Sequence, residues 1–314
     1  MTMQRRILPL AALVFCVALA APAQANFKVG MADQDAAMFD NPRFKKLDIE
    51  RVRFLVPYDW RKHSGQRAEV DLFMRKAQET GTEVLAHFTS RRGCYNNGRY
   101  SRSKKCRAPS VKKYTKAFKR FRKDYPFVKT IGVWNEGNHV SQPLHNKPAL
   151  AAKYFLAARK ACRSCTLVAA DVLDGSNMIS WVNAFKRKAG SKARIWGLHN
   201  YGDVNRYRTT GTAALLRAVP GEVWATETGG ILKFLPAFKR SAKRQNKATK
   251  YMFKVFSKYD SRQPGMRSRL TRLYNYEWTG APRSARFDAG LVGPTGKPRK
   301  AYKTFKKLAK KYDR

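Results

Sequence analysis

The sequence is poor in acidic residues, and it has no long apolar run beyond its first 25 residues. It contains 21 Asp and Glu against 65 Lys and Arg, which gives a formal net charge of +44. No later stretch approaches the roughly 20 apolar residues of a membrane-spanning helix, so we expect no integral membrane segment. No composition break, linker, low-complexity segment or sequence repeat divides the chain from residue 26 to 314. We therefore expect a single domain over that range.

Histidine and cysteine are also scarce. The five histidines form no His-x-x-x-His pair or similar ligand pair, which argues against a metal-dependent hydrolase, and we expect no cofactor. Four of the five cysteines lie beyond residue 25: Cys94, Cys106, Cys162 and Cys165. An even number in an exported protein favours disulfides, here Cys94 with Cys106 and Cys162 with Cys165. A redox or zinc half-site at Cys162 and Cys165 is the alternative.

The first 25 residues have the pattern of a secretory signal peptide. Arg5 and Arg6 precede an apolar run, and Ala23-Gln24-Ala25 supplies small residues at a cleavage site. The apolar run is too short, and wrongly flanked, for a membrane anchor. We therefore expect residues 1–25 to be removed and residues 26–314 to be secreted as an extracellular domain.

The large positive charge predicts an attraction to polyanions that salt would weaken. Anionic cell-wall polymers, acidic polysaccharides, membrane surfaces and nucleic acids are the candidate partners. Lys and Arg are nevertheless spread over the whole chain and are not gathered in one arm. A generally basic, well-solvated surface is an equally good interpretation of this charge.

From residue 26 on, short apolar runs alternate with longer amphipathic ones, which is the pattern of βα repeats around a parallel sheet. Eight apolar runs are expected to be strands, at 27–32, 52–56, 83–88, 131–136, 166–171, 194–199, 222–227 and 270–278. About eight amphipathic helices alternate with them. A single (β/α)8 TIM barrel of the α/β class accounts for this order, and the length is close to the roughly 250 residues typical of that fold.

In such a barrel the functional side chains project from the carboxyl ends of the strands. Two of these ends carry a carboxylic acid: Glu136 follows Asn135, and Glu227 is followed, after one residue, by two glycines. A pair of carboxylic acids is what cleavage of a glycosidic bond requires. The other side chains that we expect at strand ends are Arg53, His87, His199, Tyr201 and Trp278.

With these residues in this order, the chain resembles the retaining glycoside hydrolases of the large (β/α)8 clan whose acid/base and nucleophile lie on strands four and seven. Cellulase-like family 5 is the closest pattern, although the residues that flank the motifs differ from those of cellulases and resemble the xylosidase-like and laminarinase-like families equally. The resemblance implies that Glu136 is the acid/base and Glu227 the nucleophile. It also implies that Asn135 binds the sugar 2-hydroxyl.

The same resemblance implies roles for the remaining strand-end residues. Tyr201, in His199-Asn200-Tyr201, would contact the nucleophile, and Arg53 would hold the nucleophile ionised. His87 and Trp278 would be a subsite histidine and a sugar-stacking tryptophan. The chain departs from the clan pattern at Gly137, where many members have proline.

The chemistry of two acids adds two expectations. A partly buried Glu136 beside an anionic Glu227 should have a raised pKa and hold its proton. Retention requires the carboxyl groups to be about 5–5.5 Å apart.

Taken together, the signal peptide, the barrel and the two acids lead us to expect a secreted, monomeric enzyme that hydrolyses the O-glycosidic bonds of a β-linked oligo- or polysaccharide. A barrel that binds glycan without cleaving it, and a basic protein that binds a polyanion or a cell surface, are the alternatives.

Overall fold

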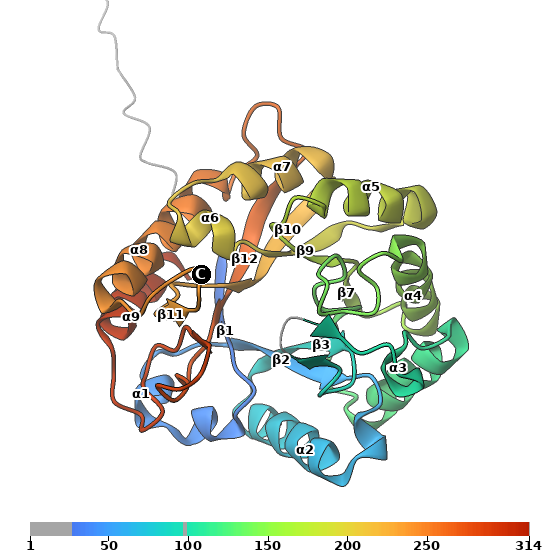
Figure 1. The fold of residues 1–314 in the computed structure, drawn as a ribbon, viewed down its shortest axis with the longest axis horizontal. Coiled ribbons are helices and arrows are strands. Elements are labelled where there is room, and N and C mark those ends of the chain that lie inside the picture. The colour runs from blue at the N-terminus through green and yellow to red at the C-terminus, as the bar shows by residue number, and fades with distance from the viewer. Residues whose placement is uncertain (1–26, 97–98, 314) are drawn as a thin grey trace, which may run out of the picture.

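The computed structural model describes residues 27–96 and 99–313. The expected signal peptide, residues 1–25, lies outside the described residues. Figure 1 shows a ring of helices around a central set of strands. No helix in the described ranges is both long enough and apolar enough to cross a bilayer.

The strands form one nine-stranded parallel sheet in the order β7-β6-β3-β2-β1-β12-β10-β9-β8, a nearly closed barrel. Their bounds are β1 Lys28–Ala32, β2 Arg51–Pro57, β3 Glu83–Thr89, β6 Thr130–Gly132, β7 Thr166–Val168, β8 Asp171–Leu173, β9 Ile195–His199, β10 Gly221–Thr228 and β12 Ser268–Tyr276. β7 and β8 are two pieces of the single strand expected at 166–171. Between them the Ala169 amide donates to the Ile195 carbonyl at 2.9 Å, which bridges the pieces to β9. The predicted (β/α)8 fold is confirmed.

Helices alternate with these strands and cover the outside of the barrel. They are α1 Pro42–Lys45, α2 Ser64–Glu79, α3 Val111–Asp124, α4 Pro148–Ala161, α5 Met178–Ala189, α6 Tyr201–Asn205, α7 Thr210–Ala218, α8 Ala242–Tyr259 and α9 Lys300–Tyr312. Local sequence explains several of them: Ser110 and Ser241 cap α3 and α8 by accepting from backbone amides at 3.3 and 3.2 Å. α3 then buries an apolar stripe of Tyr114, Phe118 and Phe121 against the sheet.

Short elements in the loops escaped the sequence analysis. β4 (Tyr95–Asn96) pairs with β5 (Arg99–Tyr100), and β11 (Lys233–Phe234) pairs with β13 (Phe287–Asp288). Four short 3-10 helices lie at Ala36–Asp40, Trp60–Lys62, Lys104–Cys106 and Gly190–Lys192. Strands of two residues leave almost no periodic pattern, which is why the sequence did not indicate them.

Both predicted disulfides are present. Cys94 is bonded to Cys106 and Cys162 to Cys165, with 5.5 Å between the Cα atoms in each pair. The first closes the loop that carries β4 and β5, and the second closes the turn between α4 and β7. Both sulfurs of Cys162 and Cys165 are therefore used in a disulfide, and the zinc half-site alternative does not apply to this structure.

Two glycines make room for polar side chains inside the barrel. A Cβ at Gly132 on β6 would lie 2.0 Å from the His87 ring, and one at Gly197 on β9 would lie 2.0 Å from Oδ1 of Asp171. His87 and Asp171 are both fully buried. The strands thus leave space at their carboxyl ends for a polar group of side chains where most barrels pack branched apolar residues.

Candidate active site

The side chains of Glu136 and Glu227 both contact His199, although β6 and β10 are separated by other strands. β6 ends at Gly132, so Glu136 lies in the turn that follows it, while Glu227 is on β10 itself. Nδ1 of His199 is 3.0 Å from Oε1 of Glu136 and 3.7 Å from Oε2 of Glu227. The barrel topology therefore brings the two acids to a single nitrogen atom.

These two contacts set an upper limit on the separation of the acids. Both oxygens touch the same Nδ1 atom of His199, so they are at most about 7 Å apart, the sum of the two distances. That limit, which applies to one pair of oxygens, is compatible with the about 5–5.5 Å between carboxyl groups that is typical of retaining enzymes. The side chains of Glu136 and Glu227 are 19% and 12% exposed, so both are open to a ligand.

The turn that carries Glu136 explains the departure at Gly137. Glu136 has φ of 45°, in the left-handed region that non-glycine residues rarely adopt and that is often found at functional sites. The amide of Gly137 donates to the Asp171 carbonyl at 2.8 Å. A Cβ at Gly137 would lie 2.8 Å from the Trp181 ring. Proline, which has no N–H and has a ring, would lose the hydrogen bond and collide with Trp181.

Glu227 is held by donors on both oxygens. Nη1 of Arg53 donates to Oε2 at 2.8 Å, and the Tyr201 hydroxyl donates to Oε1 at 3.1 Å. These are the contacts that the resemblance implied for Arg53 and Tyr201. A charge-assisted bond from a fully buried guanidinium fixes the carboxylate in place.

Arg53 also organises its neighbours. Its Nη2 donates to Oδ1 of Asn135 at 2.5 Å, and its Nε donates to Nδ1 of His87 at 3.2 Å. The oxygen of the Asn135 amide is thereby occupied, and its NH2 group is the part available to a ligand. Arg53 thus links Asn135, in the turn after β6, to Glu227 on β10 through hydrogen bonds from one buried side chain.

Asp171, at the start of β8, was missed as a site residue. It is fully buried, and its Oδ2 lies 2.9 Å from Nε2 of His199 and 3.5 Å from both Nη2 of Arg53 and Nε2 of His87. It also accepts a hydrogen bond from the Thr226 hydroxyl. Burial raises the pKa of Asp171, but the surrounding positive charges outweigh this and hold it well below its usual range. A buried anion therefore lies directly under the two acids. The sequence did offer a signal for Asp171, because it is an acidic residue at the carboxyl end of the strand expected at 166–171.

The charge of Asp171 changes the expected proton position. Burial lowers the pKa of His199, but the charges of Asp171 and Glu227 raise it to about 10. Burial raises the pKa of Glu136, but the hydrogen bond and charge of His199 leave it below its ordinary value. The expectation of a raised pKa for Glu136 is therefore wrong for the resting site. One proton is shared between Glu136 and His199, and it lies on His199 because Asp171 is next to it.

Three residues expected to bind substrate are covered by other side chains. Arg53, His87 and His199 are each 0% exposed. Burial lowers the pKa of His87 to about 3, so its ring is neutral under Arg53. The prediction that His87 is a subsite residue is wrong, because its ring lies inside the barrel. Arg53 and His199 act on the two acids and do not reach a sugar directly.

Trp278 does not face the site either. β12 ends at Tyr276, two residues before the expected end, and Trp278 lies beyond it. Its ring is 1% exposed and packs edge-on against Phe44 at 5.4 Å and Tyr302 at 5.8 Å. The prediction of a sugar-stacking role for Trp278 is wrong because its two neighbours cover it.

Three half-buried aromatic rings near Glu227 offer the stacking surface that was predicted for Trp278. Tyr276 at the end of β12 and Tyr201 lie 6.1 and 6.0 Å from the Phe287 ring, measured between ring centroids. All three rings are partly exposed. They form one aromatic wall on the Glu227 side of the mouth, and aromatic faces of this kind pack against sugar rings.

A cavity of ≈ 700 Å³ opens on the other side, at the ends of β1, β2 and β3. Polar side chains dominate its lining, among them Gln34, Arg91, Tyr95, Ser141 and Gln142. Its wall reaches Glu136 through His139, whose Nδ1 is 3.7 Å from Oε2 of Glu136 and whose ring is 6.3 Å from that of Tyr95. Within the described ranges, no group of three or more His, Cys, Asp and Glu side chains is arranged to hold a metal ion.

Replacing Asp171 with asparagine should move the alkaline limb of the pH profile. Without the anion the pKa of His199, about 10 in this site, falls toward its ordinary value, so the Glu136–His199 pair loses its shared proton at lower pH. The alkaline limb of kcat/KM on an aryl glycoside is expected to move down by at least about one pH unit. Breaking a buried ion pair should also lower Tm. A lower kcat with an unmoved limb would give Asp171 a structural role alone.

Glu277, which follows Tyr276, should make stability pH-dependent. Burial, and then the charge of Asp33, raise its pKa from 4.5 to about 8. The folded state is therefore destabilised as pH rises from 4.5 to about 8, because only the unfolded chain ionises freely there. We expect Glu277→Gln to leave Tm unchanged near pH 4.5 and to raise it by roughly 2–4 °C at pH 8. Glu79→Gln, on the exposed face of α2, is the control; a pH-independent difference for Glu277→Gln would contradict the assignment.

Among the comparisons with known proteins, the one with solved structures gives matches. No protein-family model matches the sequence, and no curated protein sequence matches it. Among solved structures, a GH5_18 protein from Streptomyces cattleya in complex with GlcNAc has a TM-score of 0.62 at 13% identity, covering 92% of this chain and 81% of its own. Xylanase 10B from Thermotoga maritima has a TM-score of 0.57 at 14% identity, covering 91% and 96%.

A third solved structure extends the same pattern. A psychrophilic glycoside hydrolase family 10 endo-β-1,4-xylanase has a TM-score of 0.58 at 13% identity, covering 90% of this chain and 96% of its own. At such identities the likeness concerns the fold, and the neighbours come from several families. The chain therefore has a (β/α)8 barrel fold that these solved glycoside hydrolases share, as the alternation of apolar and amphipathic runs predicted.

Proposed function

We propose that this chain is a retaining glycoside hydrolase that cleaves a β-linked glycan by double displacement, with Glu136 as acid/base and Glu227 as nucleophile. The observation that carries the proposal is the contact of one His199 nitrogen with both acids, at 3.0 and 3.7 Å. The solved neighbour described as an endo-β-1,4-xylanase supports a β-linked substrate.

The first step uses the two acids together. A Glu227 oxygen, oriented by Arg53 and Tyr201, attacks the anomeric carbon and forms a glycosyl ester. The glycosidic oxygen takes a proton from Glu136 as its bond to the anomeric carbon breaks. Since the resting proton lies on His199, 3.0 Å from Oε1 of Glu136, it crosses that hydrogen bond during the step.

The second step reverses these roles. Ester formation removes the negative charge of Glu227, and the Glu136–His199 pair has lost its proton to the leaving group. Glu136 is then a base, beside a neutral imidazole, and it removes a proton from water as the water attacks the anomeric carbon. The sugar is released with retained configuration, and Glu227 returns to its ion pair with Arg53.

The surroundings of the acids support a sugar ligand at the mouth. The aromatic wall of Tyr201, Tyr276 and Phe287 offers ring faces next to Glu227. The polar cavity at the ends of β1 to β3 offers hydroxyl, amide and guanidinium groups on the Glu136 side. A bound glycan would cross between the two, with the scissile bond over His199.

Export is part of the proposal. The N-terminal pattern of residues 1–25 predicts a signal peptide, and the two disulfides suit an oxidising compartment. The enzyme would then act as a monomer on extracellular or cell-wall glycan.

Turnover of a panel of aryl β-glycosides and β-glycans tests the proposal. Hydrolysis of at least one member, with the β-anomer as the first product by proton NMR, is the expected result. The α-anomer as first product would contradict the retaining mechanism. Binding of glycan without turnover across the panel would favour a non-catalytic glycan-binding barrel. Binding of polyanions alone, unchanged by Glu136→Gln and Glu227→Gln, would favour a basic surface-binding protein.

A further inference from the structure

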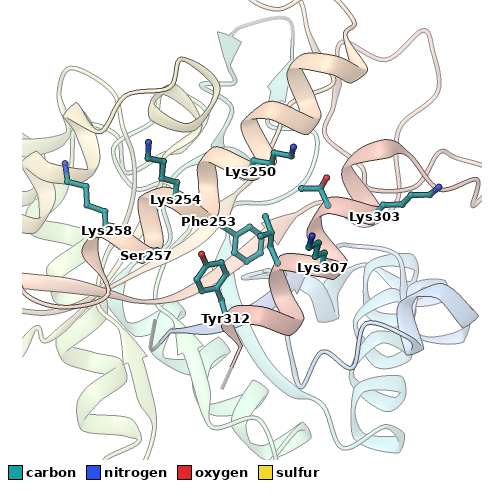
Figure 2. A pocket seen from close by; sticks show the side chains of 10 residues that line it. Lys250, Phe253, Lys254, Ser257, Lys258, Lys303, Lys307 and Tyr312 are labelled. Atoms are coloured by element: carbon teal, nitrogen blue, oxygen red, sulfur yellow. The ribbon is translucent and has the colours of Figure 1, made fainter. Parts of the chain in front are cut away.

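A groove of ≈ 810 Å³ runs between α8 and α9 on the outer wall of the barrel. Figure 2 shows lysines on both of its sides: Lys250, Lys254 and Lys258 from α8, and Lys303 and Lys307 from α9. All five are exposed, and no acidic residue is among those that line the groove. We call these five residues the lysine groove.

The lysine groove lies away from the two acids. Its inner end is formed by Tyr312 and Phe253, whose rings pack 5.5 and 6.4 Å from that of Phe27. Phe27 directly precedes β1, so this contact marks the amino end of the barrel. Glu136 and Glu227 are at the carboxyl end. A ligand in the groove would therefore not enter the site of the two acids.

The floor of the groove is fixed before any ligand arrives. The Thr304 hydroxyl donates to Oδ1 of Asn246 at 2.6 Å, and Phe253 packs 5.7 Å from Phe305, so α8 and α9 are tied together. Phe253 is buried, and Leu308 and Tyr312 are partly buried under the lysine side chains. The groove is a preformed apolar channel between two rows of cations, which lowers the entropy cost of binding.

The lysine rows are electrostatically unfavourable in the free protein. Neither α8 nor α9 contains an Asp or Glu, and the lysines recur four residues apart on each helix. Like charges at this spacing destabilise a helix, whereas alternating charges would stabilise it. An anionic ligand that neutralises both rows would remove this repulsion.

We propose that the lysine groove binds a single extended chain of an acidic polysaccharide. Lysines four residues apart on a helix are about 6 Å apart along its axis, which makes each row a ladder of point charges. A carboxylate-bearing polysaccharide presents one anion per sugar along an extended chain. The axes of packed helices lie about 8–10 Å apart, so the two lysine rows flank one narrow groove, along which one such chain would lie.

Other polyanions fit the lysine groove less well. Binding of single-stranded nucleic acid uses free aromatic faces, but the Tyr312 ring is already stacked against Phe27 and Phe253, with interplanar angles of 21° and 22°. A membrane-binding helix exposes its apolar face, whereas most of the apolar residues of α8 and α9 are buried.

Binding of labelled polygalacturonate oligomers to the full-length mature protein, followed by fluorescence anisotropy, tests this site. The variant Lys250→Gln/Lys254→Gln/Lys307→Gln should weaken binding by about tenfold at about 50 mM salt. The control Lys112→Gln/Lys119→Gln/Lys123→Gln removes the same charge from exposed positions on α3 and should weaken it less than about twofold. Binding by wild type should fall steeply as salt is raised.

Three results would overturn the proposal. Equal weakening in both triple variants would mean that net charge alone attracts the polymer. Tighter binding of polyphosphate or a single-stranded oligonucleotide, lost in the same groove variant, would assign the groove to a phosphate polymer. Absence of polygalacturonate binding by wild type at low salt would remove the site altogether. None of these readouts depends on glycoside turnover, and hydrolysis of a neutral aryl glycoside should be the same in both triple variants.

Discussion

Replacing Glu227 with glutamine is expected to lower kcat/KM by about 10⁴-fold or more on every substrate that the wild type hydrolyses. An amide oxygen is too weak a nucleophile to form the glycosyl ester, so the loss should not depend on the leaving group. The amide can still accept a hydrogen bond from Arg53, which donates to Glu227 at 2.8 Å, so the fold should survive. Steady-state kinetics with aryl and natural glycosides, and Tm by calorimetry, are the measurements.

Glu222→Gln is the matched control for this substitution. Glu222 is on the same strand, β10, but at its amino end, where it accepts from Nε1 of Trp224 at 3.0 Å and from Thr271 at 2.8 Å. An amide oxygen can accept at the same place, so activity should stay within about twofold of wild type. If Glu227→Gln kept more than about a hundredth of the activity while folded, the nucleophile would have to be another residue.

The barrel and the two acids were predictable because they depend on local sequence patterns. Apolar runs separated by amphipathic stretches identify parallel strands, and parallel strands place their carboxyl ends at one rim. Glu136 and Glu227 follow two such runs, so the rim brings them close whatever the details of packing. The even number of cysteines similarly indicated the Cys94–Cys106 and Cys162–Cys165 bonds, which the structure contains.

The errors concern features that depend on contacts between remote parts of the chain. β12 ends at Tyr276 where the following segment turns away, and there the Thr279 amide donates to Oδ2 of Asp33 at 2.6 Å. Asp33 is far away in sequence, so nothing near Trp278 indicated that this ring would be buried. Strand length is set by such tertiary contacts more than by local propensity.

The protonation of the acids was beyond sequence reasoning for the same reason. Asp171 lowers the pKa of Glu136 through His199, and the three residues are brought together by β8, β9 and the turn after β6. Without the buried anion, two neighbouring glutamates would by themselves predict a raised pKa for one of them. With it, the proton rests on the imidazole. The pKa of an active-site acid thus depends on a charge that it does not touch.

Replacing Glu136 with glutamine should lower kcat/KM by an amount that depends on the leaving group of the substrate. For a natural glycan the departing oxygen needs a proton, and kcat/KM is expected to fall by about 10³–10⁴-fold. A dinitrophenyl β-glycoside leaves without a proton, so its kcat/KM should fall by less than about tenfold. Release of the glycosyl ester still needs a base, so kcat and KM should both drop on that substrate.

Azide separates loss of the base from a general defect in the Glu136→Gln variant. It is a nucleophile that needs no deprotonation, so it should restore kcat on the dinitrophenyl β-glycoside and yield a β-glycosyl azide. The β-configuration is expected because azide attacks the ester from the side that water would use. The wild type should be insensitive to azide, since its own base already activates water. Equal losses on good and poor leaving groups, with no response to azide, would show that Glu136 is not the acid/base. The proton that rests on His199, 3.0 Å away, would then have to reach the glycosidic oxygen by another route.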